Sequence, residues 1–337
     1  MSEKIENLLG EDRTFDPPSS IVENANATQE WFDLANEDRL AYWQKQALER
    51  ITWYKEPKEI LDDSDAPFFK WFKDGELNLS YNCLDRHLET DGDRIAFYWE
   101  GEPGDSQEIT YQDLYERVCK LSNGLKELGV KKGDRIAIYL GMTPEIVISM
   151  LACARIGAVH SVVFGGFSAE ALADRINDAE AKVVITADGA WRRGDIVPLK
   201  QNVDDSLKLT DHIESVIVVK RTENEVTMVD GRDYWYSELV DKQEADCEPE
   251  VMNAEDMLYI LYTSGTTAKP KGIVHTQAGY LTGVTTTHSA VFDVKEDDIY
   301  WCAADCGWVT GHSYIVYGPL ANKTTSVMYE GAPNAPD

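Results

Sequence analysis

The sequence has few cysteines, and none has the spacing of a metal site. Its six cysteines are scattered without a CxxC pair, as Cys83, Cys119, Cys153, Cys247, Cys302 and Cys306. Cysteine-based zinc sites need closely spaced ligand pairs, so we expect no metal site of this kind. In a chain of 337 residues we expect free, buried thiols, which suit a reducing compartment such as the cytoplasm.

Long apolar segments are lacking as well. A membrane-spanning helix needs ~18 or more consecutive apolar residues, and no run approaches that length. The N-terminal stretch MSEKIENLLGEDRTF has no apolar core of a secretory signal. We therefore expect a cytoplasmic protein without a membrane partner.

Basic residues are few relative to acidic ones. Sixty Asp and Glu stand against 32 Lys and Arg, which leaves a net charge of −28. Such a surface repels nucleic acid and anionic lipid, so neither is expected as a partner. This acidic composition fits an ordinary cytoplasmic protein and a protein adapted to high salt equally well. Anionic small molecules can still bind, because nearby donors outweigh a screened net charge at contact distance.

The composition is otherwise that of a globular protein. Hydrophobic residues make up 43% of the chain, with 9 Trp and 16 Tyr. The length exceeds that of one ordinary core, so we expect subdomains. We predict an aromatic-rich extension over residues 1–100 that wraps the main body and buries its rings. A first α/β subdomain follows over 101–254, and a second subdomain begins within 255–337.

From Thr110 onward, helical and strand patterns alternate. Thr110 and Asp113 have the spacing of a capping box that opens a helix. Apolar residues recurring at three and four predict helices, whereas short continuous apolar runs predict strands. Expected helices cover 110–128, 143–156 and 168–178, with another over 36–50; expected strands cover 135–140, 160–164, 181–187, 214–220 and 257–261. This alternation predicts an α/β fold with mostly parallel sheets and helices on both faces.

One stretch, YTSGTTAKPKG (262–272), is dense in hydroxyl and cationic side chains directly after the strand expected at 257–261. Ligands of parallel sheets bind beyond the carboxyl ends of strands. Hydroxyls and lysines there suit a polyphosphate, and Gly265 lets the backbone approach it closely. The stretch is not a Walker A loop, because Pro270 stands where the second Gly would be required.

YTSGTTAKPKG resembles the signature loop of adenylate-forming enzymes, the acyl-CoA synthetases and their relatives, with Ala268 at a position that is usually Gly. Two longer segments are similar to the AMP-forming acetate–CoA ligases within that superfamily. They are FGGFSAEALADRINDAEAKVVITADGAWRRGDIVPLK (164–200) and DCGWVTGHSYIVYGPLANKTTSVMYEG (305–331). The likeness runs from about Trp31 to the end of the chain.

The resemblance implies a two-step reaction. Acetate and ATP give acetyl-AMP and pyrophosphate, and CoA then gives acetyl-CoA and AMP, with Mg²⁺ as cofactor. The substrates acetate, ATP and CoA would be the partners of the protein. The residues that match the ATP phosphate loop are Thr263, Ser264, Gly265, Thr266, Thr267, Lys269 and Lys271.

The same resemblance implies two further sets of residues. Those matching the acyl pocket are Trp308, Val309 and Thr310, and those matching the CoA site are Arg192, Arg193, Gly194, Asp195, Thr310 and Asn334. Asp195 departs from the family, which often has a basic residue there. His160, His275 and His312 adjoin these motifs, but acetate is already ionised at pH 7 and needs no base.

In the resembled enzymes roughly half the chain follows the segment matched here. The catalytic lysine lies in that part, so we assign no catalytic residue and expect residues 1–337 to be an N-terminal portion that is not competent alone. Two alternatives stay open. They are a ligase for propionate or another short acid, and a non-catalytic fragment that binds CoA or nucleotide. The sequence does not predict the oligomeric state.

Overall fold

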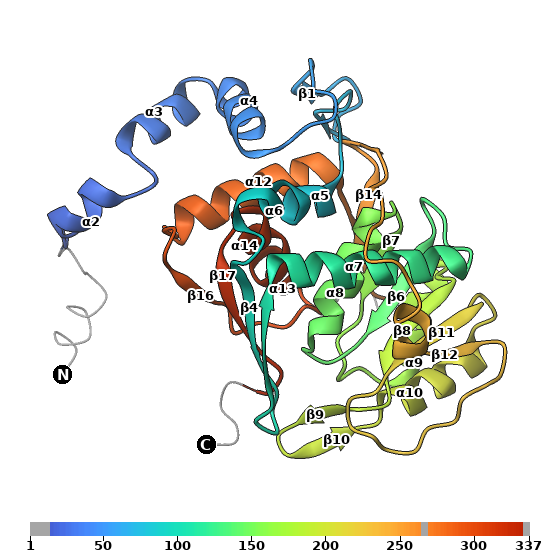
Figure 1. Cartoon of the computed structure of the whole chain (residues 1–337). Helices are drawn as coiled ribbons and strands as arrows, with labels where there is room; N and C mark the ends of the chain where they lie inside the picture. Colours follow the sequence, from blue (N-terminus) through green and yellow to red (C-terminus); the bar gives the residue numbers. More distant parts are fainter. Residues whose placement is uncertain (1–13, 264–268, 333–337) are drawn as a thin grey trace, which may run out of the picture.

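The centre of the molecule is a seven-stranded sheet, seen in a computed structural model that describes residues 14–263 and 269–332 (Figure 1). The strand order is β12-β11-β8-β6-β7-β14-β15. Neighbours are parallel except β14 and β15. The strands are β6 (Arg135–Tyr139), β7 (Val159–Val162), β8 (Val183–Ala187), β11 (Ser215–Val219), β12 (Asp233–Trp235), β14 (Met257–Thr263) and β15 (Lys271–Thr276). The predicted α/β fold with a mostly parallel sheet is confirmed.

Helices cover this sheet. They are α7 (Tyr111–Glu127), α8 (Pro144–Arg155), α9 (Ala169–Ala179), α10 (Leu199–Ser206), the 3₁₀ turn η1 (Leu207–Leu209) and α11 (Tyr236–Val240). Crossovers between parallel strands are right-handed. The β6–α8–β7 connection runs in one direction along the sheet and the β7–α9–β8 connection in the other. Helices α8 and α9 therefore lie on opposite faces. Among the residues described, no helix combines the length and apolar character needed to cross a membrane.

Two helix starts show how local sequence sets these elements. The hydroxyl of Thr110 accepts the N–H of Asp113, and the Asp113 carboxylate accepts the N–H of Thr110, as the capping box predicts. At α9 the Ser168 hydroxyl accepts the N–H of Ala171. Each bond satisfies a backbone donor that the first turn leaves unpaired, which fixes where the helix begins.

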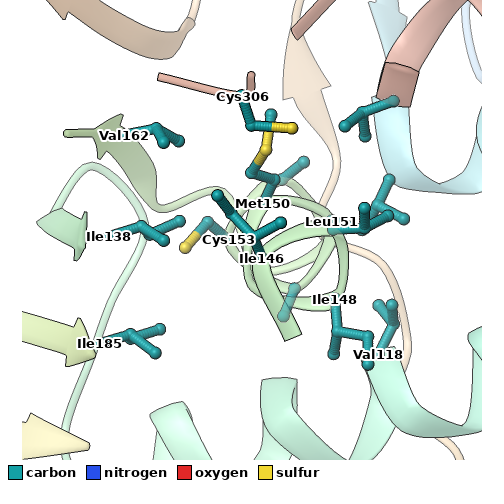
Figure 2. Packing of buried hydrophobic residues seen from close by; sticks show 14 of the residues in the cluster. Val118, Ile138, Ile146, Ile148, Met150, Leu151, Cys153, Val162, Ile185 and Cys306 are labelled. Carbon is teal, nitrogen blue, oxygen red and sulfur yellow. The ribbon is translucent and has the colours of Figure 1, made fainter. Parts of the chain in front are cut away.

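Helix α8 is the centre of the core. All of its residues except Glu145 are buried, because its sequence PEIVISMLACAR is apolar on every side. Figure 2 shows side chains of α8 directed toward strand residues Ile138 and Ile185 on one side and toward Val118 of α7 on another. Cys306, from the C-terminal part of the chain, lies over the same helix (Figure 2).

A second, four-stranded sheet has the order β16-β17-β4-β5. Its strands are β4 (Ile95–Glu100), β5 (Ser106–Thr110), β16 (Ile299–Trp301) and β17 (Thr325–Tyr329). The segments between β15 and β17 include α12 (Gln277–Val291), α13 (Val309–Gly311), the π-helical turn η2 (His312–Tyr317) and α14 (Gly318–Ala321). The division into 1–100, 101–254 and 255–337 stays a prediction, although β4–β17 and β7–β14 pairing joins segments across its boundaries.

The N-terminal extension packs on the body only in part. It comprises α2 (Ser19–Asn24), α3 (Gln29–Glu37), α4 (Arg39–Arg50), α5 (Leu79–Cys83), α6 (Asp85–Asp91) and the short strands β1 (Leu61–Asp62), β2 (Lys70–Trp71) and β3 (Glu76–Leu77), with β3 pairing β13 (Met252–Asn253). Helices α2 and α3 lead away from the body (Figure 1). Tyr42 and Phe72 are buried, but Phe68 and Phe69 are 72% and 52% exposed. The expectation that the extension buries its rings is therefore wrong for Phe68 and Phe69, and also for Phe32 and Tyr54, which are exposed.

The helix expected over 36–50 begins later, at Arg39, because Asp38 is its cap. The Asp38 carboxylate accepts the N–H groups of Leu40 and Ala41 at 3.0 and 2.9 Å. The prediction for the thiols is confirmed: all six cysteines are free, and all are buried except Cys302, which is partly exposed.

Candidate functional site

A cavity of about 380 Å³ lies beyond the carboxyl ends of strands from both sheets. Met142 and Phe164 follow β6 and β7 of the large sheet. Cys302 and Glu330 follow β16 and β17 of the four-stranded sheet. Parallel α/β sheets bind ligands at this edge, so the topology itself marks the cavity as the candidate site.

Three of the predicted site residues line this cavity. Arg192 comes from β9 (Ala190–Arg192), whereas Trp308 and Thr310 come from the segment at the start of α13. Arg192 and Trp308 are therefore more than a hundred positions apart in the sequence, yet the fold brings them to one cavity. Val309 is 46% exposed and does not line the cavity. Asn334 lies outside the described residues.

Charged groups of opposite sign meet in the cavity. The Arg192 guanidinium lies 5.0 Å from the centre of the Phe164 ring. Burial raises the pKa of the Asp305 carboxyl, whereas the Gly307 N–H and the charge of Arg192 act in the opposite direction. Asp305 was not singled out from the sequence, although it directly precedes the Trp308 segment. Asp305 and Arg192 thus place charges of opposite sign at the lining of the cavity.

The turn after Arg192 joins β9 to β10 (Asp195–Val197), with Arg192 opposite Asp195. Arg193 and Gly194 both have positive φ, 55° and 81°. Positive φ at both central residues is the geometry of a tight type I′ hairpin turn, for which Gly is well suited. Arg192, Arg193 and Asp195 are all exposed at this turn, and of the three only Arg192 lines the cavity.

A carboxylate binds the backbone of this turn. Oε2 of Glu102 accepts the N–H of Arg193 at 2.9 Å, and Oε1 accepts the N–H of Gly194 at 2.6 Å. No local sequence signal could reveal this contact, because Glu102 precedes Arg193 by 91 positions.

The position of Trp308 and Thr310 at the cavity depends on Gly311, which lets α13 pack closely. Trp308 is about half exposed, and its ring centre lies 6.0 Å from that of Phe164. A Cβ on Gly311 would lie 2.2 Å from the carbonyl oxygen of Asp305, closer than any real contact. Only Gly at this position lets α13 pack against the Asp305 loop, which sets where Thr310 faces the cavity.

The described ends of the predicted phosphate loop lie on the paired strands β14 and β15. Thr263, the last residue of β14, pairs with Lys271, the first of β15. Lys269 and Lys271 are exposed. The structure therefore places Thr263 opposite Lys271, with Lys269 exposed two positions before it. The remaining predicted loop residues, Ser264, Gly265, Thr266 and Thr267, lie outside the described residues, as does Ala268.

A second cavity of about 380 Å³ adjoins the β14–β15 hairpin and is lined by Arg175, Tyr262 and Lys269. The Arg175 guanidinium lies 4.5 Å from the ring centre of Phe167 and 5.5 Å from that of Tyr262. The Tyr262 hydroxyl donates to Asp178 at 2.7 Å, which ties β14 to α9. Arg175 was not singled out from the sequence, because an arginine on an expected helix gives no signal of its own.

Three histidines pack around Tyr259 of β14, next to the hairpin and the Trp308 segment. His160 of β7 and His312 pack on Tyr259 of β14, and His275 of β15 stacks on the same ring. Burial lowers the pKa of His160 and His275, and lowers that of His312 to about 4. His312 Nδ1 lies 3.1 Å from the Trp308 carbonyl oxygen. The three rings thus pack between the β14–β15 hairpin and the segment that carries Trp308 and Thr310. These two segments are the candidate binding segments.

The chain is similar to known proteins over nearly its whole length. Residues 84–337 match the family described as "AMP-binding enzyme" and residues 17–83 match "Acetyl-coenzyme A synthetase N-terminus". An acetyl-coenzyme A synthetase of Streptomyces avermitilis is 59% identical over 99% of this chain, which covers 52% of that relative. Those of Pasteurella multocida and Mycolicibacterium smegmatis are 55% and 54% identical over 98% and 96% of this chain, covering 52% and 34% of each relative.

The chain thus spans about half the length, or less, of the curated relatives it matches. Its match to the family extends over most of its residues, including both candidate binding segments. The chain therefore belongs to the AMP-binding enzyme family, and its first part is the N-terminal segment typical of acetyl-coenzyme A synthetases.

Proposed function

We propose that this chain is the N-terminal portion of an AMP-forming acetate–CoA ligase. The observation that carries the proposal is the cavity beyond the carboxyl ends of both sheets, which is lined by Arg192, Trp308 and Thr310. A cation, a large apolar ring and a hydroxyl suit a ligand with an anionic part and a small acyl group. The relatives named as acetyl-coenzyme A synthetases support the same function.

In the first step a carboxylate oxygen of acetate attacks the α-phosphorus of ATP. The bond from that phosphorus to the bridging oxygen breaks, and pyrophosphate leaves with the electron pair. Such transfers depend mainly on positioning and on neutralising phosphate charge. Thr263, Lys269 and Lys271 at the hairpin tip are the described donors proposed for the phosphates, together with the predicted loop residues between them.

In the second step the thiolate of CoA attacks the carbonyl carbon of acetyl-AMP, and AMP leaves as the carbon–oxygen bond breaks. Arg192 and Arg193 are proposed to bind phosphates of CoA, with Gly194 forming the turn between the strands. Trp308, Val309 and Thr310 are proposed to bound the acyl group, Trp308 by its ring and Thr310 by its hydroxyl. Thr310 and Asn334 are proposed as further CoA contacts.

Mg²⁺ is proposed to arrive with the nucleotide as MgATP. Across residues 14–263 and 269–332, no group of three or more His, Cys, Asp and Glu side chains is arranged to hold a metal ion. The described residues therefore do not fit a resident metal, and we assign them no role in binding one.

The proposal is tested by following two reactions of the intact protein with formate, acetate, propionate and butyrate. Labelled pyrophosphate should exchange into ATP only when an acid is present, and fastest with acetate. AMP should be released only when CoA is also added. Fastest exchange with propionate would identify a different short-chain ligase. Binding of CoA without exchange for any acid would overturn the enzymatic function.

A further inference from the structure

The turn between β9 and β10 is bound by one carboxylate from a distant part of the chain. Glu102 accepts both backbone N–H groups of the turn, from Arg193 at 2.9 Å and from Gly194 at 2.6 Å. Hydrogen bonds to an ionised acceptor are short and about twice as strong as neutral ones. Figure 1 shows the β9–β10 hairpin beside the turn that joins β4 to β5, where Glu102 lies.

The segment that carries Glu102 is itself firmly held. The N–H of Gly101 donates to the Asp105 carbonyl at 2.7 Å, which closes the turn between β4 and β5. Arg221 forms a two-point ion pair with Asp105, at 2.8 and 3.0 Å. A Cβ on Gly101 would lie 2.1 Å from Asp105 and 2.5 Å from Arg221, so this ion pair would have to shift to admit a larger residue.

The same network reaches the floor of the candidate cavity. The N–H of Glu102 donates to Oε2 of Glu330 at 3.2 Å, and Nε of Arg221 donates to Oε1 of Glu330 at 2.8 Å. Glu330 is buried and lines the cavity that Arg192 also lines. Glu102 therefore joins the hairpin that carries Arg192 to the end of β17, where Glu330 lines the same cavity.

Without this carboxylate the turn would be poorly determined. Arg193 adopts a positive φ, which is unfavourable for a side chain other than Gly or Asn. The hairpin strands are three residues each, too short to be stable alone. The hairpin packs against little else at its tip, where Arg192 to Asp195 are exposed.

We infer that Glu102 is a positioning residue, which holds the Arg193–Gly194 turn so that Arg192 and Arg193 face a phosphate-bearing ligand at the mouth of the cavity. This inference rests on the proposed function, because the ligand chemistry is that of CoA. Glu102 itself touches no substrate. It acts by reducing the number of conformations that the two arginines must give up when the ligand binds.

The test uses Glu102→Ala and Glu102→Gln in the intact protein, with Glu100→Ala as a matched control. Glu100 is exposed on β4, so its loss removes the same charge two residues away. We expect Glu102→Ala to raise the KM for CoA about tenfold, because two charge-assisted bonds are lost. The KM for CoA of Glu102→Gln should lie between those of the unmodified protein and Glu102→Ala, since the amide oxygen still accepts one N–H. Acetate-dependent ATP–pyrophosphate exchange should be unchanged in all three variants.

A second readout does not depend on catalysis. Amide hydrogen exchange of a peptide covering residues 190–197 should become faster in Glu102→Ala and not in Glu100→Ala. Unchanged exchange there, or a KM for CoA that stays constant or falls, would overturn the positioning role. A falling KM would mean that the Glu102 carboxylate competes with the ligand. Failure of the unmodified protein to bind CoA would contradict the proposed function as well.

Discussion

At the scale of single residues, the proposed first step depends most on the cations at the hairpin tip. Lys271 begins β15 directly opposite Thr263, so the strand ladder fixes its backbone at the base of the loop. Its side chain is exposed, and Lys271 lies level with the carboxyl end of β14. A cation held there by regular structure can stabilise charge on a phosphate without much rearrangement.

Replacing Lys271 with Ala should slow acetyl-AMP formation about 10²-fold, the usual effect of removing one electrostatic contact to a transition state. Its effect on the dissociation constant for CoA should be within about twofold. Pyrophosphate exchange and CoA titration measure the two effects separately. Lys208→Ala is the control, since Lys208 lies on the surface next to Asp205. Equal losses in both measurements would argue against a phosphate role for Lys271.

At the scale of elements, the sequence predicted five of the seven strands of the large sheet but not β12, β15 or the strand order. Short apolar runs predicted β6, β8 and β11 closely, since buried parallel strands are continuously apolar. The four-stranded sheet was not predicted. Its central strand β17 pairs in parallel with β4, more than two hundred positions earlier, and no local pattern specifies such a pairing.

Within the candidate site, too, some residues could be predicted from the sequence and others depend on contacts that only the fold creates. Arg192, Trp308 and Thr310 were predicted from the resemblance to the acetate–CoA ligases, and the structure places them around one cavity. Asp305 was missed because a carboxyl becomes distinctive only when it is buried. Glu102 was missed because its role depends on a contact with a turn far along the chain.

Element packing around the cavity can be tested with two glycines. Gly311→Ala should destabilise the protein by about 1–3 kcal/mol, because its Cβ forces α13 away from the Asp305 carbonyl. Gly283→Ala is the control in helix α12, where a Cβ meets nothing within 4 Å. It should stabilise by about 0.5–1 kcal/mol through helix propensity alone. Urea unfolding measures both, and a neutral Gly311→Ala would contradict the close packing described for α13.

At the scale of the whole molecule, several buried histidines link stability to pH. Burial lowers the pKa of His288 and of His312 to about 4, and lowers that of His160 well below its usual value. These side chains stay neutral in the folded protein. In the unfolded chain a histidine has a pKa of about 6.5. The unfolded state therefore binds more protons between these values, and the folded state loses stability as pH falls from about 6.5 toward 4.

The free energy of unfolding should accordingly fall between pH 7 and pH 5, with a limiting slope of about 1.4 kcal/mol per pH unit for each buried histidine. Denaturant titrations at several pH values give this slope directly. His288→Asn should reduce the slope, whatever its effect on stability at pH 7. His212→Asn should leave it unchanged, because His212 is exposed. A slope that is unaffected by His288→Asn would show that other groups govern the acid response.

The central claim is that the β14–β15 hairpin tip binds the phosphate tail of ATP at the edge of the large sheet. The most direct measurement is a crystal structure of the intact protein with bound ATP. We predict contacts from the β- and γ-phosphates to Thr263, to Lys271 and to the loop between them. A phosphate tail bound elsewhere, with the hairpin tip directed into solvent, would contradict the account.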